Sequence, residues 1–176
     1  MTKLVTTKRL EGEFDRAQEY VKTHILFPSS VLGLIFMVAG AAALIYQFVL
    51  KIYGWQTFLQ STGLIFGGAV LGWGQTRYHR YVLSEHPAYF AARMRTFSQA
   101  RMKSTKRGPP APELQHPGRN LVPAFYVLGF LILFGIAGLA STYGEVFFVA
   151  AFTLPWAGFF WAKLYFWRDI FAARRS

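Results

Sequence analysis

The chain has 176 residues, of which 53% are hydrophobic and 18% aromatic, and it contains no cysteine. This length suits one small domain, and the lack of cysteine excludes disulfides, thiolate metal sites and a cysteine nucleophile. Nineteen Lys and Arg against eight Asp and Glu give a net charge of +11. Because the basic residues flank long apolar runs, we interpret them as orienting the chain in a bilayer, and we expect no nucleic-acid partner.

The first 27 residues predict an amphipathic cytoplasmic helix that precedes the membrane. Its apolar positions recur at helical spacing and lie on one face: Leu10, Phe14, Ala17, Val21 and Ile25. Such a helix is expected to lie on the membrane face or on a partner. Proline fits the first turn of a helix, so Pro28 is expected to end this helix and to begin the next.

Residues 28–76 predict a first transmembrane hairpin. The stretch 28–50 contains no charged residue. At about 1.5 Å per residue, it is long enough to cross a hydrocarbon core of about 30 Å. A short turn containing Lys51 leads to a second span over residues 57–76. Glycines in this span remove side-chain bulk, which lets a neighbouring backbone come close: Gly63, Gly67, Gly68 and Gly72.

Residues 77–119 predict a basic cytoplasmic loop, in which Pro87 is expected to begin a helix and RGPPAPELQHPG to form a Pro-rich linker. The basic cluster at the start of the loop has two interpretations. One is a positive-inside anchor. The other is a site for the headgroup of an anionic lipid such as cardiolipin. The residues of this headgroup site are Arg77, Tyr78, Arg80, Arg93 and Arg95.

Residues 120–168 predict a second transmembrane hairpin with a very short turn, followed by a basic cytoplasmic tail over residues 169–176. Small residues again provide faces for helix packing: Gly135, Gly138, Gly158 and Ala162.

Aromatic residues near the end of this hairpin predict a belt at the membrane interface, formed by Trp161, Tyr165 and Trp167. Lys163 lies among them, and its long side chain is expected to reach the interface by snorkelling.

The distribution of Lys and Arg predicts the topology. Five precede the first span, one lies between spans one and two, nine lie in residues 77–119, none lies in the second turn, and four lie at or after the end of the last span. Because cytoplasmic segments carry an excess of Lys and Arg, both termini and the loop are expected in the cytoplasm. The expected membrane is the inner (cytoplasmic) membrane of a bacterium. The expected fold is an all-α membrane protein with four transmembrane helices in two hairpins, an N-terminal amphipathic helix and a basic cytoplasmic loop.

Catalytic and metal-binding motifs are missing from the sequence. It contains no HExxH and no GxSxG, and the middles of the expected spans carry no Asp, Glu, Lys, Arg or His. His24 and His79 are candidates to ligate haem iron or the magnesium of a chlorin. The alternative is that both are interfacial histidines, and we expect neither a cofactor nor a metal.

These observations predict a non-catalytic accessory subunit of a larger membrane complex, with other membrane subunits and anionic lipids as partners. The aromatic content suits a respiratory or photosynthetic energy-transducing complex, although no motif points to one. A small homo-oligomeric transporter or channel is the alternative, and a lipid-modifying membrane enzyme is a third hypothesis.

Overall fold

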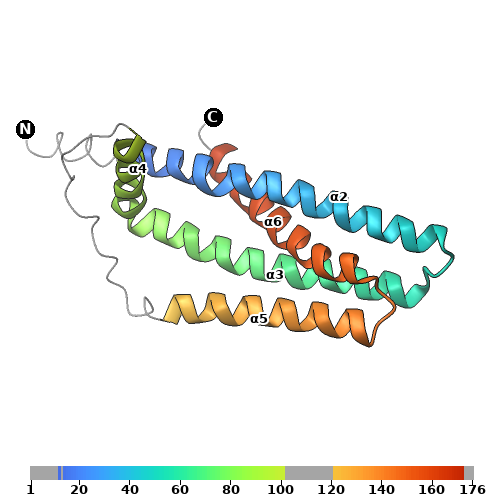
Figure 1. Cartoon of the computed structure of the whole chain (residues 1–176). Helices are drawn as coiled ribbons and strands as arrows, with labels where there is room; N and C mark the ends of the chain where they lie inside the picture. Colours follow the sequence, from blue (N-terminus) through green and yellow to red (C-terminus); the bar gives the residue numbers. More distant parts are fainter. Residues whose placement is uncertain (1–11, 13, 102–120, 173–176) are drawn as a thin grey trace, which may run out of the picture. The chain divides into compact units, whose positions relative to one another are not determined.

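The computed structural model describes residues 12, 14–101 and 121–172, without the side chains of 95–101 and 169–172. Every element in this part of the chain is a helix (Figure 1), which confirms the expected all-α class. The elements are η1 (Val21–Leu26), α2 (Phe27–Val49), α3 (Trp55–Glu85), α4 (Pro87–Arg101), α5 (Leu121–Thr142) and α6 (Phe148–Ala172). Leu10, the Pro-rich linker and the end of the basic tail lie outside the described residues.

The chain divides into two compact units, which we describe separately. The first, here called the small unit, comprises the described residues of 1–27 and 77–119. The second, here called the bundle unit, comprises the described residues of 28–76 and 120–176.

The expectation that Pro28 ends a helix is wrong, because the helical backbone runs from Phe14 to Val49. A proline ring would clash with the carbonyl one turn earlier in a regular α-helix. Here the preceding residues widen into the π-helix η1, and Phe27 donates its backbone N–H to the carbonyl of Lys22, five residues earlier. The wider turn accommodates the ring, so the helix continues through the proline.

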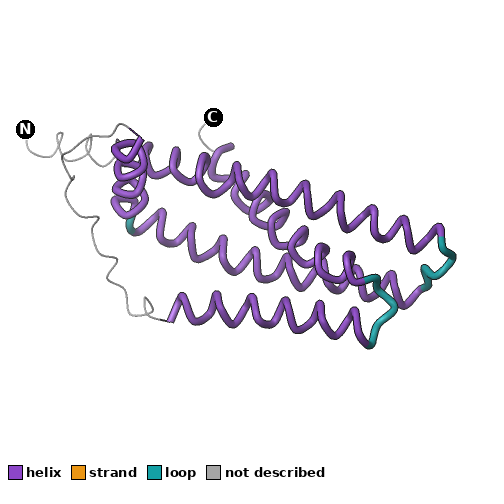
Figure 2. The backbone as a smooth tube through the Cα atoms, in the orientation of Figure 1, coloured by secondary structure: helices purple, strands orange, loops and turns teal. Residues whose placement is uncertain are grey.

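The bundle unit contains two antiparallel hairpins, α2 with α3 and α5 with α6. Figure 2 shows the two connecting turns, residues 50–54 and 143–147, at the same end of these helices. Two helices of the described chain are long and apolar enough to cross a membrane: the helix Phe14–Val49, which contains α2, and α5.

Helices α2 and α3 each bury a stripe of small or short polar side chains. On α2 the stripe consists of Ser29, Gly33, Gly40, Ala43 and Gln47. On α3 it consists of Thr57, Ser61, Leu64, Gly68, Gly72 and Thr76. In a lipid bilayer an apolar side chain is in an apolar environment whether it contacts protein or acyl chains. Helices in lipid therefore associate through small residues that let their backbones approach closely.

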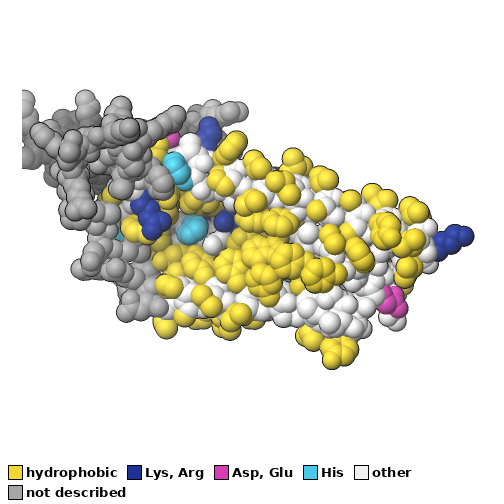
Figure 3. All heavy atoms as spheres, in the orientation of Figure 1, with side chains coloured by type: hydrophobic (Ala, Val, Ile, Leu, Met, Phe, Trp, Pro, Cys, Tyr) yellow, Lys and Arg dark blue, Asp and Glu magenta, His cyan; other side chains and the backbone are white. Residues whose placement is uncertain are grey.

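Large apolar side chains point outward from the same helices. Exposed examples occur along α2, α3 and α5, among them Phe48, Phe66 and Leu131. Figure 3 shows hydrophobic side chains over most of the face it draws. Lys51 and Glu145 are exposed in the two turns. A water-soluble protein rarely exposes so continuous an apolar surface, so this pattern favours contact with lipid or with partner helices.

The small unit has a core of its own. Ala17 and Val21 are fully buried, as the helical spacing of the N-terminal residues predicted, whereas Phe14 is 38% exposed. From α4, which begins at Pro87 as expected, Phe90 packs on the ring of Tyr20 with 5.8 Å between the ring centroids. The beginning of the basic loop is therefore a folded helix rather than an extended chain.

Candidate functional site

The closest helix contact in the bundle unit joins α3 to α6. A Cβ atom at Gly68 would overlap the carbonyl oxygen of Pro155, and one at Gly158 would overlap the carbonyl oxygen of Ile65. Gly72 faces the carbonyl of Phe159, and a Cβ there would lie 3.1 Å from that of Ala162. Each helix thus places a glycine against the backbone of the other, so neither surface tolerates a side chain.

The remaining small residues that the sequence singled out have no such neighbour. A Cβ at Gly63, Gly67, Gly135 or Gly138 would meet no described atom within 4 Å. Gly67 and Gly68 are adjacent in sequence but lie on different sides of α3. The glycines therefore form two classes, one that packs α3 on α6 and one that faces outward from the described helices.

Hydrogen bonds from two glutamine side chains connect the turn between α5 and α6 to the first hairpin. The Gln47 side chain donates to the carbonyl of Glu145 at 2.7 Å and accepts from the backbone N–H of Phe147 at 3.1 Å. The side-chain oxygen of Gln60 accepts from the backbone N–H of Glu145 at 3.0 Å. We call these contacts the glutamine clasp. They occupy both glutamine side chains between segments of the chain.

Aromatic rings cover the face of α6 that meets α5. Trp156 is the centre of this cluster, and it stacks on Phe130 with 5.2 Å between the ring centroids. One turn earlier on α6, Phe152 packs on Phe134 at 5.5 Å. These two pairs define an antiparallel register in which four residues forward on α6 correspond to four residues back on α5.

Lys163 lies on this same face and does not extend toward the interface. It is only 7% exposed, and its Nζ lies 5.1 Å from the ring centroid of Phe159 and 6.0 Å from that of Phe160. Side chains on a helix tilt toward its N-terminus, so this ammonium points back along α6, where it makes cation–π contacts. The expectation that Lys163 snorkels is therefore wrong.

The expected aromatic belt is also incomplete. Trp161 and Tyr165 are exposed, but Trp167 is fully buried. Arg168 covers the Tyr165 ring, with its guanidinium carbon 4.2 Å from the centroid.

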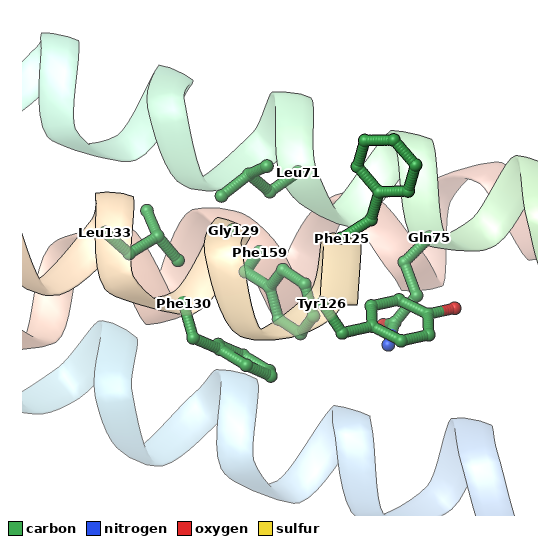
Figure 4. A pocket seen from close by; sticks show the side chains of 8 residues that line it. All are labelled: Leu71, Gln75, Phe125, Tyr126, Gly129, Phe130, Leu133 and Phe159. Carbon is green, nitrogen blue, oxygen red and sulfur yellow. The ribbon is translucent and has the colours of Figure 1, made fainter. Parts of the chain in front are cut away.

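A cavity of about 40 Å³ lies between α3, α5 and α6, and Figure 4 shows its lining. The lining is apolar except at one end, where Gln75 and Tyr126 lie: Leu71, Gln75, Phe125, Tyr126, Gly129, Phe130, Leu133 and Phe159. The side-chain oxygen of Gln75 is buried and accepts no hydrogen bond from the described residues. Sequence reasoning missed this site. The available signal was a glutamine two residues before Arg77 in an otherwise apolar helix.

The two candidate histidines lie in the small unit, and each contacts at least one aromatic ring. His24 stacks on Tyr20, with ring centroids 4.9 Å apart and ring planes 8° from parallel. His79 meets the Phe90 ring edge-on at 6.4 Å. Since Tyr20 and Phe90 also contact each other, these rings link the two histidines into one aromatic cluster. No group of three metal-ligating side chains occurs among the described residues.

The expected headgroup residues lie on two helices of the small unit. Arg77 and Arg80 are exposed on α3, and the guanidinium carbon of Arg93 on α4 lies 4.9 Å from the centroid of the Tyr89 ring. Tyr78 lies between Arg77 and His79 on α3 and is half-buried. The side chain of Arg95 lies outside the described part of the chain.

Comparison of the chain with protein families, with curated proteins and with solved structures found no match.

Proposed function

We propose that the chain is an integral membrane protein with four spans, and that it serves as a non-catalytic subunit of a larger membrane assembly. Two spans are α2 and α5, whose length and composition support the assignment. The other two are α3 and α6. With 31 and 25 residues they extend about 46 and 37 Å, more than a hydrocarbon core of about 30 Å requires.

The distribution of Lys and Arg supports cytoplasmic termini and a cytoplasmic loop, as in a bacterial inner membrane. Labelling of single cysteines in intact cells tests this topology. Tyr143 is 88% exposed in the turn between α5 and α6, so Tyr143→Cys should react with a membrane-impermeant reagent added outside. Ser84→Cys, at the end of α3, should react only after the cells are opened. The opposite result would reject the orientation.

The outward-facing glycines are the observation that supports a role as a subunit. Gly63 and Gly67 on α3 and Gly135 and Gly138 on α5 leave the helix backbone open to a close neighbour that the described chain does not supply. Membrane helices use such surfaces to approach one another. The partner is therefore another membrane subunit, and the aromatic-rich composition is compatible with a respiratory or photosynthetic energy-transducing complex.

Two adjacent substitutions distinguish association from folding. Gly68→Leu places a side chain against the Pro155 carbonyl and should prevent the chain from folding. Gly67→Leu should leave the chain folded but remove its partners, because a Cβ at that position meets only open space. Purification in mild detergent and mass spectrometry of the intact particle measure both effects. Normal assembly of Gly67→Leu would reject this face as an interface.

A homo-oligomeric transporter or channel is the second candidate, and Lys163 is the observation that favours it. An ionisable group buried among membrane helices often marks a pathway for a substrate or an ion. Particles that contain only copies of this chain would favour this candidate, whereas other subunits in the particle would favour the accessory role.

The basic face of the small unit supports anionic lipids as further partners. Arg77 and Arg80 are exposed on either side of Tyr78 in the sequence of α3, and the guanidinium of Arg93 lies over the Tyr89 ring. Phosphate groups accept bidentate hydrogen bonds from arginine, so cardiolipin-like headgroups suit this surface.

A further inference from the structure

The cavity between α3, α5 and α6 has a polar end and an apolar end. Tyr126 lies near the start of α5, and Leu133 lies seven residues further on, about 10 Å deeper along the helix axis. Figure 4 shows Gln75 and Tyr126 at one end of the cavity and Leu133 at the other. In the proposed topology the polar end is the cytoplasmic one.

Gln75 makes the polar end incomplete. Its side-chain oxygen is buried at the cavity wall with no hydrogen-bond donor among the described residues. A buried acceptor without a donor is costly, so this position favours a bound group that carries a hydroxyl.

Lys163 does not line the cavity, but its ammonium contacts a side chain that does. Its ammonium lies over the Phe159 ring, which lines the cavity. The register of Trp156 with Phe130 and of Phe152 with Phe134 places Lys163 opposite the first turns of α5, which include Tyr126.

No acidic side chain of the bundle unit lies near this ammonium in the part that the structure describes. Glu145 is the only such acid, and it lies in the turn before α6, whereas Lys163 is about 22 Å along that helix from Phe148. Lys163 makes no hydrogen bond or ion pair with a described residue. A buried cation favours an anionic partner, and no described side chain of these helices provides one.

We propose that this cavity is a binding site for one anionic phospholipid of the cytoplasmic leaflet whose headgroup carries hydroxyl groups, of the phosphatidylglycerol type. The lipid phosphate pairs with Lys163, a headgroup hydroxyl donates to the Gln75 oxygen, and part of one acyl chain occupies the apolar end. A cavity of about 40 Å³ holds roughly three water-sized groups, enough for a few methylenes but too little for a ring. The inference rests on the proposed membrane placement.

Titration of the detergent-purified protein with phosphatidylglycerol, followed by native mass spectrometry, tests this proposal. The wild type should bind one phosphatidylglycerol at least tenfold more tightly than zwitterionic phosphatidylcholine. Lys163→Met should weaken phosphatidylglycerol binding about tenfold to hundredfold, as expected for a lost charge-assisted hydrogen bond. Lys163→Arg keeps the charge and should keep the binding.

Two further variants examine the other parts of the site. Gln75→Leu should remove the preference for phosphatidylglycerol over phosphatidic acid, whose headgroup carries no hydroxyl beyond its phosphate. Gly129→Leu fills the cavity from α5, where a Cβ already lies 3.5 Å from Leu71, and should weaken the binding of both lipids.

Matched controls exclude general effects of charge and bulk. Gly74→Leu adds the same side chain to α3 at a position with no neighbour within 4 Å, and Lys51→Met removes an exposed lysine in the turn after α2. Both should bind phosphatidylglycerol like the wild type. Circular dichroism shows whether each variant has kept its helices.

Equal binding of phosphatidylglycerol by the wild type and a folded Lys163→Met variant would overturn the site, as would equal affinity for phosphatidylcholine. Retention of a fatty acid or quinol in place of a phospholipid would overturn the ligand class. Extraction of cell membranes with alkaline carbonate tests separately whether the chain is an integral membrane protein, as the proposed function requires. A chain that stays in the membrane but lacks lipid selectivity contradicts only the lipid site, whereas a chain released by carbonate contradicts the membrane placement itself.

Discussion

Helices α5 and α6 belong to one hairpin but occupy opposite environments. Only Leu133 and Ala137 are buried on α5, and 11% of the residues in its most apolar stretch are buried. On α6, burial extends from Ala150 to Trp167, and the helix contacts α2, α3 and α5. Of the two, only the peripheral helix α5 is apolar enough along its length to meet the composition of a membrane span.

Apolar content therefore does not mark the interior of this bundle. Lipid chains are as apolar as leucine, so a membrane helix gains little by burying large aliphatic side chains against protein. Interior position instead requires small side chains that let backbones approach, and α6 provides them at Ala150, Ala157, Gly158 and Ala162. Small side chains, rather than high hydropathy, distinguish the central helix α6 from the peripheral helix α5.

The largest expected difference between the two helices is in their response to one added methyl group. Gly158→Ala on α6 should lower the free energy of unfolding by about 3 to 4 kcal/mol, because the new Cβ overlaps the Ile65 carbonyl and the backbone cannot yield. In Gly135→Ala on α5 the new methyl group has no neighbour within 4 Å. This substitution should raise the free energy of unfolding by up to about 1 kcal/mol, because alanine has a higher helix propensity than glycine. Unfolding in detergent, followed by circular dichroism, measures both. Similar effects of the two substitutions would remove the distinction between the helices.

A pair of leucines sharpens the comparison at the level of packing. Leu154→Ala on α6 should cost about 3 kcal/mol, because this side chain is 1% exposed within the cluster formed with Ala43 and Leu64. Leu131→Ala on α5, where the side chain is 62% exposed, should change the stability by less than about 0.5 kcal/mol. The same unfolding assay applies, and a large loss in Leu131→Ala would show that α5 packs against something that the described chain lacks.

The smallest expected effect concerns how α6 is fixed at its first turn. Gln47→Leu should cost about 2 kcal/mol, since it leaves the Glu145 carbonyl and the Phe147 N–H without their partner. Gln56→Leu, at an exposed position in the first turn of α3, should be neutral within about 0.5 kcal/mol. If the two variants melt alike, the clasp contributes nothing to the position of α6.

Much of the helical architecture could be predicted because it depends on local pattern. The spacing of Ala17 and Val21, the proline at the start of α4 and the uncharged residues of α2 and α5 each act within a few turns of one helix. Pro28 misled the prediction because its effect depends on the π-turn before it, and regular helical spacing does not reveal such a turn.

The candidate site was less predictable because it depends on helix rotation. Gly67 and Gly68 are equivalent as letters in a sequence, and only the packing of α3 on α6 decides which of them is covered. The direction of the Lys163 side chain and the cavity at Gln75 also depend on how the helices pack. Each needs the register of three helices, which no single stretch of sequence contains.

The glutamine clasp has a consequence for the order in which the chain folds. Gln47 bonds to backbone groups 98 and 100 residues further along, and Gln60 to one 85 residues further along. During synthesis the first hairpin is made long before these partners exist, and contacts so distant in sequence form late. Until then the polar side chains of Gln47 and Gln60 have to be satisfied by water or by the membrane-insertion machinery. Closure of the clasp therefore reports that both hairpins are in place, and a chain truncated before residue 145 would carry two unsatisfied glutamines that quality control could recognise.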